Sequence, residues 1–259
     1  MQIRLEKYLA DSGFGTRSQV KKIIKQGNVF VNGVPEKDGS RRVDTDADEV
    51  VCNGKKVGYC EYEYYLLYKP AGIITASRDK TEKTVVDMIE SKKRRDLFPV
   101  GRLDRDTEGL LLITNDGKLS HELLAPGKHV DKEYIALIEG IIPDYTIERF
   151  REGVDIGDEE LTKPAELVIY EKVEDTGDDR IKEKYIEITR EMNETGQEKN
   201  ISAIRITITE GRYHEIKRMF EVVGCKVVYL KRISMGKLNL PADMDLGEYI
   251  KIDKSDIVS

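Results

Sequence analysis

From residue 64 onward the chain is a succession of short apolar runs separated by charged or glycine-containing connections. Such runs are typical of buried strands, whereas apolar residues spaced three or four apart are typical of helices. Strands are predicted at 64–69, 110–115, 133–139, 164–172, 182–190, 201–209 and 226–233. Helices are predicted at 84–91, 118–124, 144–152 and 214–223. Strands beyond residue 160 follow one another directly, which favours antiparallel pairing, so the predicted class is α+β with a mainly antiparallel sheet.

The first 60 residues follow a different pattern. Two helices and two strands are expected there, at 3–10, 17–26, 29–33 and 50–57. Thr16 is a plausible cap for the second helix, and Gly27 stops it. The pattern breaks at 58–63, where a strongly apolar segment begins. We therefore predict a small α/β domain at residues 1–60 and a larger domain at residues 61–259.

Length and composition describe a folded chain. Of 259 residues, 39% are hydrophobic and 36% are charged. No apolar run approaches the ~20 residues that a membrane helix requires, and the N-terminal segment lacks the apolar stretch of a secretory signal. A cytoplasmic location is the expectation.

Cysteine and histidine are sparse. Cysteine occurs at three scattered positions, which forms neither a disulfide framework nor a C-x-x-C zinc motif. The three histidines likewise lack metal-ligand spacing. We therefore predict no metal.

The formal net charge of −6 is unevenly distributed. Residues 1–60 hold 11 Lys and Arg against 8 Asp and Glu, and residues 205–232 hold 7 against 3. Residues 171–199 hold 6 Lys and Arg against 10 Asp and Glu. This acidic segment is expected to face away from any nucleic acid. On the helix predicted at 17–26, basic residues recur every fourth position and form a stripe. That stripe is either a solvated helix face or a surface for phosphate groups.

The segment GRLDRDTEGLLLITNDG at 101–117 places three acidic residues and two arginines before an apolar strand. Composition alone permits an ordinary surface turn here. Paired carboxylates also occur in glycosidases and magnesium sites. Neither alternative is specific to this pattern.

The order of residues in that segment is more informative. GRLD followed by T-x-G-L-L-L-x-T-x-D-G resembles the signature of RNA pseudouridine synthases, and three further blocks agree: LLYKPAGIIT at 66–75, KEYIALIEG at 132–140 and EGRYHEIKRMF at 210–220. The resemblance is strongest to the RsuA-type group. The first 58 residues resemble the S4-like RNA-binding module that this group carries.

The resemblance implies a set of catalytic residues and a reaction without cofactors. It makes Asp104 the essential carboxylate, and leaves open whether Asp104 acts as nucleophile, base or electrostatic partner. Tyr134 would stack on the target base and help remove a proton from the ring carbon, and Lys217 would pair with Asp104. Ile216 would supply an apolar wall.

Other residues are expected to contact RNA. Around the catalytic loop these are Arg102, Arg105, Arg212, Tyr213, His214 and Arg218. The basic groups near the start of the helix at 214–223 are unfavourable for the helix dipole, which indicates a partner charge, either carboxylate or phosphate. In the S4-like module the expected contacts to the RNA backbone are Arg17, Ser18, Lys21, Lys22, Lys25 and Asn32.

The expected substrate is ribosomal RNA. Tyr213 and His214 stand where groups that act on large-subunit RNA tend to have Asn-Arg, so the resemblance favours a uridine of 16S RNA in partly assembled small subunits, with 23S RNA as the alternative. A different class of function is a non-catalytic RNA-binding factor for ribosome assembly. The expected oligomeric state is a monomer.

Overall fold

The computed structural model describes residues 1–90, 94, 96–196 and 199–258. The chain divides into two compact units. The N-terminal unit comprises Met1–Glu63 and Ile89–Leu97, and the larger unit comprises Tyr64–Met88 and Phe98–Ser259. The boundary expected after residue 60 lies three residues before this division. The association of 89–97 with the N-terminal unit was not expected from the sequence.

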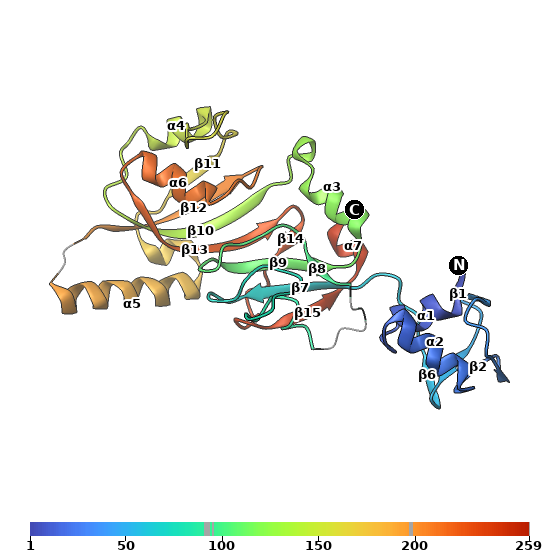
Figure 1. Cartoon of the computed structure of the whole chain (residues 1–259). Coiled ribbons are helices and arrows are strands. Elements are labelled where there is room, and N and C mark those ends of the chain that lie inside the picture. The colour runs from blue at the N-terminus through green and yellow to red at the C-terminus, as the bar shows by residue number, and fades with distance from the viewer. Residues whose placement is uncertain (91–93, 95, 197–198, 259) are drawn as a thin grey trace. The chain divides into compact units, whose positions relative to one another are not determined.

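In the N-terminal unit, two helices pack with two small sheets (Figure 1). The helices are α1 (Leu5–Asp11) and α2 (Arg17–Lys25). One sheet pairs β1 (Gln2–Arg4) with β4 (Arg42–Asp44), and the other has the order β3 (Val34–Pro35), β2 (Val29–Val31), β5 (Val50–Cys52) and β6 (Lys55–Val57). Apolar side chains from both helices and from β2 and β5 share one buried core.

Local sequence signals account for most of this unit. Thr16 caps α2 as predicted, accepting a hydrogen bond from the backbone nitrogen of Gln19 at 3.3 Å. The helix predicted at 3–10 begins only at Leu5, because Gln2–Arg4 pairs with β4. The region 50–57 forms a hairpin of two strands.

The larger unit is built on a nine-stranded sheet of mixed direction (Figure 1). Its main order is β11 (Glu166–Ile169), β12 (Ile201–Ile208), β10 (Lys132–Glu139), β13 (Lys226–Met235), β9 (Glu108–Thr114), β7 (Tyr64–Lys69) and β15 (Tyr249–Ile252). Two short strands complete it: β8 (Phe98–Pro99) pairs with β9, and β14 (Leu238–Asn239) pairs with β13. The predicted α+β class with mainly antiparallel strands is confirmed.

Strands β9 and β13 are parallel to each other, unlike the other paired strands that the structure describes in this sheet. Gly109 lies opposite Arg232 at this junction. A Cβ atom at position 109 would lie 2.2 Å from the carbonyl oxygen of Arg232, and the backbone φ of Gly109 is +114°. Both facts require glycine, so this residue permits the two backbones to approach.

Helices cover both faces of the sheet. Helices α4 (Thr146–Glu152) and α6 (Glu215–Val222) lie on one face, and the rings of Phe150 and Phe220 meet edge to face at 5.1 Å. Helix α5 (Asp179–Thr195) lies on the other face, where Ile181 joins the core formed by Ile135 and Tyr229. Figure 1 shows α5 and α6 on either side of β13.

The shorter helical segments lie at the ends of these strands. Helices α3 (Gly117–Leu124) and α7 (Lys254–Ile257) pack in one apolar core near β7 and β9. Asp116, which caps α3, also forms a 2.9 Å ion pair with Lys254. Two short 3-10 helices are η1 (Pro126–Lys128) and η2 (Val173–Thr176).

Two predictions of secondary structure were wrong. The first is the strand at 182–190, which lies within helix α5. Asp178 caps this helix by accepting a hydrogen bond from the nitrogen of Ile181 at 3.1 Å, and Gly196 ends it. The Ile181, Tyr185 and Ile188 side chains recur at helical spacing and face the sheet. The helical spacing of the apolar residues, the cap at Asp178 and the stop at Gly196 therefore favour a helix over a strand in this segment.

The second is the helix at 84–91. Within 84–90 the chain forms an isolated bridge from Thr84 to Ile74, followed by turns; residue 91 lies outside the described residues. The carboxylate of Asp87 accepts hydrogen bonds from the nitrogen and hydroxyl of Thr84, at 2.9 and 2.8 Å. These side-chain bonds close a short turn in place of the first helical turn.

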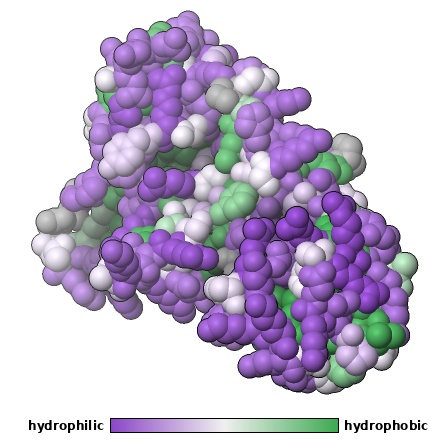
Figure 2. All heavy atoms as spheres, turned by 45° about the vertical axis from the view of Figure 1, so that its right-hand side comes forward, coloured by the Kyte–Doolittle hydropathy of each residue, from purple (hydrophilic) through white to green (hydrophobic). Residues whose placement is uncertain are grey.

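On the face drawn in Figure 2, hydrophilic residues predominate and apolar residues form small patches. In the part of the chain that the structure describes, none of the helices combines the length and the hydropathy needed to cross a bilayer.

The variant Gly109→Ala tests the parallel junction. Its methyl group would collide with the backbone of Arg232, so we expect the free energy of unfolding to fall by about 2–4 kcal/mol. Urea titration of the full chain, followed by circular dichroism, measures the loss. Gly224→Ala is the control, because φ there is +77° but, apart from the residue itself and its neighbours in the chain, no described atom lies within 4 Å of the added carbon; a loss of about 1 kcal/mol is expected. Equal losses would contradict the proposed constraint.

Candidate active site

The loop between β8 and β9 forms one wall of a pocket. Strands β10, β12 and β13 form its floor, and the turn before α6 closes the opposite side. The lining residues are Arg102, Leu103, Asp104, Thr107, Tyr134, Ile208, Gly211, Arg212, His214, Glu215, Ile216, Lys217 and Leu230. Polar groups thus gather at the loop and the turn, while apolar side chains line the floor.

Lys217 joins the two sides of the pocket. Its Nζ atom lies 3.1 Å from a carboxylate oxygen of Asp104 and 2.6 Å from one of Asp106. Burial disfavours the charged lysine, but the two carboxylates outweigh it, so the pKa of Lys217 is raised. Burial alone would raise the pKa of Asp106. The hydrogen bond and the charge of Lys217 outweigh this effect, so the pKa of Asp106 is lowered. Lys217 is therefore a fixed positive charge beside the loop between β8 and β9.

His214 contacts the second oxygen of Asp104. Its Nε2 atom lies 3.5 Å from this oxygen, in an ion pair whenever the imidazole is protonated. His214 has a left-handed backbone, with φ at 50°. Its ring stacks on that of Tyr213 at 3.9 Å, and Tyr213 is 75% exposed. The Tyr213–His214 pair is a flat surface that extends outward from Asp104.

The pocket floor is apolar and tightly packed. Tyr134 on β10 is buried, as are Ile216 at the start of α6 and Leu230 on β13. Leu103 and Ile208 complete these walls. Such walls suit a flat, weakly polar group and limit its contact with water.

Lys69 binds the backbone of the loop between β8 and β9. It is fully buried at the end of β7, and its Nζ atom donates to the carbonyl oxygens of Pro70, Arg105 and Thr107 at 3.0, 3.3 and 2.9 Å. Burial lowers its pKa to about 8, although nearby carboxylates oppose this effect. These bonds fix the backbone on either side of Asp106. This role of Lys69 was not predicted, although a lone lysine that ends a buried strand is a signal for it.

Glu108 anchors the other end of the loop from the opposite face of the sheet. It is 2% exposed, and Arg180 of α5 binds its carboxylate through two nitrogens, at 2.9 and 3.1 Å. The hydroxyl of Tyr229 donates to the same carboxylate at 2.9 Å. Beside this pair, Lys231 contacts Asp178 at 2.7 Å. The first turn of α5 therefore attaches to the base of the loop.

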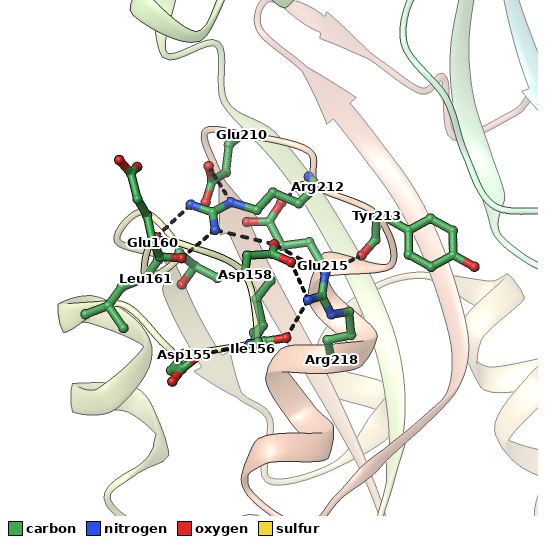
Figure 3. Close-up of polar contacts among 12 residues, drawn as sticks. Asp155, Ile156, Asp158, Glu160, Leu161, Glu210, Arg212, Tyr213, Glu215 and Arg218 are labelled. Carbon is green, nitrogen blue, oxygen red and sulfur yellow. Dashed lines mark hydrogen bonds and ion pairs between the residues drawn. The ribbon is translucent and has the colours of Figure 1, made fainter.

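Arg212 and Arg218 hold the connection that follows α4 (Figure 3). Arg212 donates to the carbonyl oxygens of Glu160 and Leu161 at 2.7 and 2.6 Å. Arg218 donates to the carbonyl oxygen of Ile156, and both arginines pair with Asp158. The partner charge expected near this helix start is thus supplied by the protein's own carboxylates.

The structure brings together most of the residues assigned around the loop. Asp104, Tyr134, Lys217, Ile216, Arg102, Arg212 and His214 all line the pocket. Arg105 does not line the pocket; its exposed guanidinium group pairs with Glu82 at 2.8 Å. Asp106 was not assigned, and only the folded chain shows that it shares Lys217 with Asp104.

The six residues assigned in the N-terminal unit are all exposed. Lys21 lies 3.5 Å from Glu6, and the hydroxyl of Ser18 lies 3.1 Å from that of Thr16. Asn32 has a positive φ, and its side chain donates to Asp48 and accepts from the nitrogen of Glu49, each at 2.8 Å. Asn32 therefore fixes a turn, while Arg17, Lys22 and Lys25 present their charges on α2.

Comparison with known families gives two matches. A model described as RNA pseudouridylate synthase matches residues 63–222, and a model described as S4 domain matches residues 3–51. The first covers more than half of the chain and includes the whole pocket loop.

Similar proteins extend over nearly the full length. The chain is 40% identical over 256 residues to an uncharacterized RNA pseudouridine synthase, YtzG, of Bacillus subtilis, covering 98% of this chain and 97% of that protein. It is 37% identical to the ribosomal large subunit pseudouridine synthase B of the same species, covering 92% and 87%. It is 35% identical to the ribosomal small subunit pseudouridine synthase A of Vibrio parahaemolyticus, covering 99% of each. A crystal structure of a pseudouridylate synthase matches with a TM-score of 0.61 and 31% identity, covering 98% of both chains.

The variant Arg180→Met tests the attachment of α5. It leaves the buried carboxylate of Glu108 without its cation. Because Arg180 is itself 28% exposed, we expect the free energy of unfolding to fall by about 3 kcal/mol, the lower end for a broken buried pair. Urea titration measures the change.

Two further variants isolate this pair. Adding Glu108→Gln should restore much of the loss, because position 108 then no longer holds an unpaired buried charge. Glu183→Gln breaks only the exposed pair of the same arginine, and should change stability by less than about 0.5 kcal/mol. A single Arg180→Met variant as stable as the parent would refute the attachment.

Proposed function

Because the chain belongs to the RNA pseudouridylate synthase family, we propose that it isomerises a uridine of ribosomal RNA to pseudouridine, with Asp104 as the essential carboxylate. One observation carries the assignment of Asp104. It is the carboxylate that lines the pocket while paired with Lys217, and Tyr134 lies in the same pocket.

The reaction needs no change in composition. The bond between the sugar C1′ and the ring N1 breaks, C1′ joins the ring C5, the proton leaves C5, and N1 gains a proton. A carboxylate beside C1′ serves as nucleophile, as base at the sugar, or as partner of a cationic sugar. Asp104 fits all three roles, and Lys217 stabilises its negative charge.

The target base must leave its stack to enter the pocket, at a cost of about a few kcal/mol. In this proposal one face of the base stacks on the ring of Tyr134, and the opposite face contacts the side chain of Ile216. Tyr134 also assists proton removal from C5. Arg102 and Arg105 hold the displaced strand, and the exposed ring of Tyr213 stacks on a neighbouring base beside His214.

Arg212 and Arg218 have a supporting role in this proposal. Their guanidinium groups are engaged by Asp158 and by backbone carbonyls. They brace the rim of the pocket, so RNA contacts from these two residues are secondary.

Residues 1–60 are the RNA-binding domain in this proposal, and residues 61–259 the catalytic domain. Phosphate contacts supply affinity and register without reading sequence. The side chains assigned to them are Arg17, Ser18, Lys21, Lys22, Lys25 and Asn32.

The proposed substrate is 16S RNA in partly assembled small subunits, bound by a cytoplasmic monomer. Tyr213 and His214 favour this choice. Modification of 23S RNA is the second candidate, favoured by the 37% identity to a large-subunit enzyme. A non-catalytic assembly factor would have no need of a carboxylate–lysine pair in a pocket.

The variant Asp104→Asn tests the catalytic assignment. It removes the negative charge and keeps the shape, so we expect the rate of pseudouridine formation to fall by at least about 10²–10⁴-fold. Pseudouridine mapping of 16S and 23S RNA, from cells that carry this variant as their sole copy, measures the loss. The site that disappears also identifies the substrate.

Asp106→Asn is the matched control, since Asp106 shares Lys217 but does not line the pocket. We expect it to retain most of the activity. Persistence of every pseudouridine in the Asp104→Asn strain would refute the assignment, and so would equal loss in the two variants.

The triple variant Arg17→Ala, Lys21→Ala and Lys25→Ala tests the basic stripe. If each cation meets one phosphate, the slope of log affinity against log salt should fall by about 2–3, because each contact contributes about 0.7–0.9. Binding to a ribosomal RNA fragment at several salt concentrations measures the slope. Lys7→Ala is the control, from the exposed side of α1. An unchanged slope in the triple variant would place the RNA elsewhere.

A further inference from the structure

Two glutamates form a largely buried pair at the wall of the pocket. Glu215, the first residue of α6, is 4% exposed and lines the pocket. The side chain of Glu210, just after β12, is 14% exposed, and its carboxylate and that of Glu215 both accept hydrogen bonds from Arg212. Two carboxylates that converge on one residue and are largely withdrawn from water repel each other, which favours a proton on one of them. The residues and the turn between them appear in Figure 3.

The pair fixes the turn that carries His214. Glu215 accepts a 2.8 Å hydrogen bond from the backbone nitrogen of Arg212, and its own nitrogen donates to the carbonyl oxygen of Arg212 at 3.3 Å. Glu210 accepts from the Nε atom of Arg212 at 3.1 Å and from the nitrogen of Lys163 at 2.7 Å. The left-handed His214 lies inside this closed turn, beside Asp104.

The charges that face the pair come from several elements. Arg212 faces it from the turn, and Asp158 in turn engages Arg212. Lys132 of β10 faces Glu215 and Glu210, with Arg232 of β13 and Asp131 beside it. Burial lowers the pKa of Lys132, with the charge of Arg232 adding to this effect. Arg212 and Lys132 are thus the cations that face the pair, and each of them also interacts with another carboxylate.

We propose that Glu210 and Glu215 share one proton, and that the protonated pair is a positioning device that holds the Arg212–Glu215 turn, and with it His214, against Asp104. Neither glutamate is a catalytic residue in this proposal; both act through the turn. The inference rests on the proposed function for its effect on activity. Its effect on stability is independent of that function.

Loss of the shared proton places two negative charges in a poorly hydrated space. Burial, followed by the charge of Glu210, raises the pKa of Glu215 to about 7. A carboxyl group with a raised pKa in the fold contributes stability that is complete below its ordinary value of 4.5 and is lost as pH rises through about 7. The turn should therefore be well held at pH 6 and loosened at pH 8.5.

The variant Glu215→Gln tests the proposal. Glutamine keeps an acceptor for the nitrogen of Arg212 and donates to Glu210 at every pH. We expect kcat of the variant divided by kcat of the parent to rise at least about threefold from pH 6 to pH 8.5, as the parent loses the proton. The ratio cancels the titration of groups common to both proteins. The difference in melting temperature should also grow in favour of Glu215→Gln from pH 5 to pH 8.

Glu221→Gln is the matched control, with the same chemical change on the exposed side of α6, and its ratio should stay flat. Glu210→Gln removes the charge of Glu210 but leaves Glu215 buried, so it should give a smaller rise in the same direction, which provides a second test if one variant folds poorly. A flat kcat ratio and a flat difference in melting temperature for both pair variants would overturn the proposal. If no RNA is modified, the proposed function fails, and the melting temperatures alone decide whether the proton is shared.

Discussion

The parallel contact between β9 and β13 determines where the site is formed. It places the loop that precedes β9 beside the helix that precedes β13, although Asp106 and Lys217 are 111 residues apart in the chain. The contact depends on the missing side chain of Gly109, because the backbone of Arg232 occupies that space. The ion pair of Lys217 with Asp104 follows from this approach, and so does the pocket between the loop and α6.

The loop between β8 and β9 is held from several directions. Lys69 binds its backbone carbonyls from β7, Lys217 neutralises its carboxylates from α6, and Arg180 binds Glu108 through the sheet from α5. Each contact involves a charged group that is at least partly withdrawn from water, where electrostatic interactions are strong. In the proposed function, the carboxylate of Asp104 must be held in a productive geometry before substrate arrives, since reorganisation during the reaction would raise the barrier. The fixed charges around Asp104 meet that requirement.

Much of this was predictable from the sequence where local pattern decides the structure. The strand at 64–69 was predicted with its observed bounds, and the signature around Asp104 identified the loop. The wrong prediction of a strand at 182–190 involves a distant partner, because the apolar period of α5 is recognisable only against the sheet that it covers. The ion pairs of Arg212 and Arg218 could not be predicted, because no local signal shows that Asp158, more than fifty residues earlier, lies beside them.

The two ends of helix α5 differ in how strongly the rest of the fold constrains them. Its first turn carries Asp178, Arg180 and Ile181, which reach β13, β9 and the core. Towards Thr195 the helix presents mainly exposed polar side chains. Substitutions and length changes among related proteins should therefore accumulate in the outer turns and spare the first. For protein engineering, the outer end of α5 is a suitable position for a tag or an inserted domain, because it lies on the face of the sheet opposite the pocket.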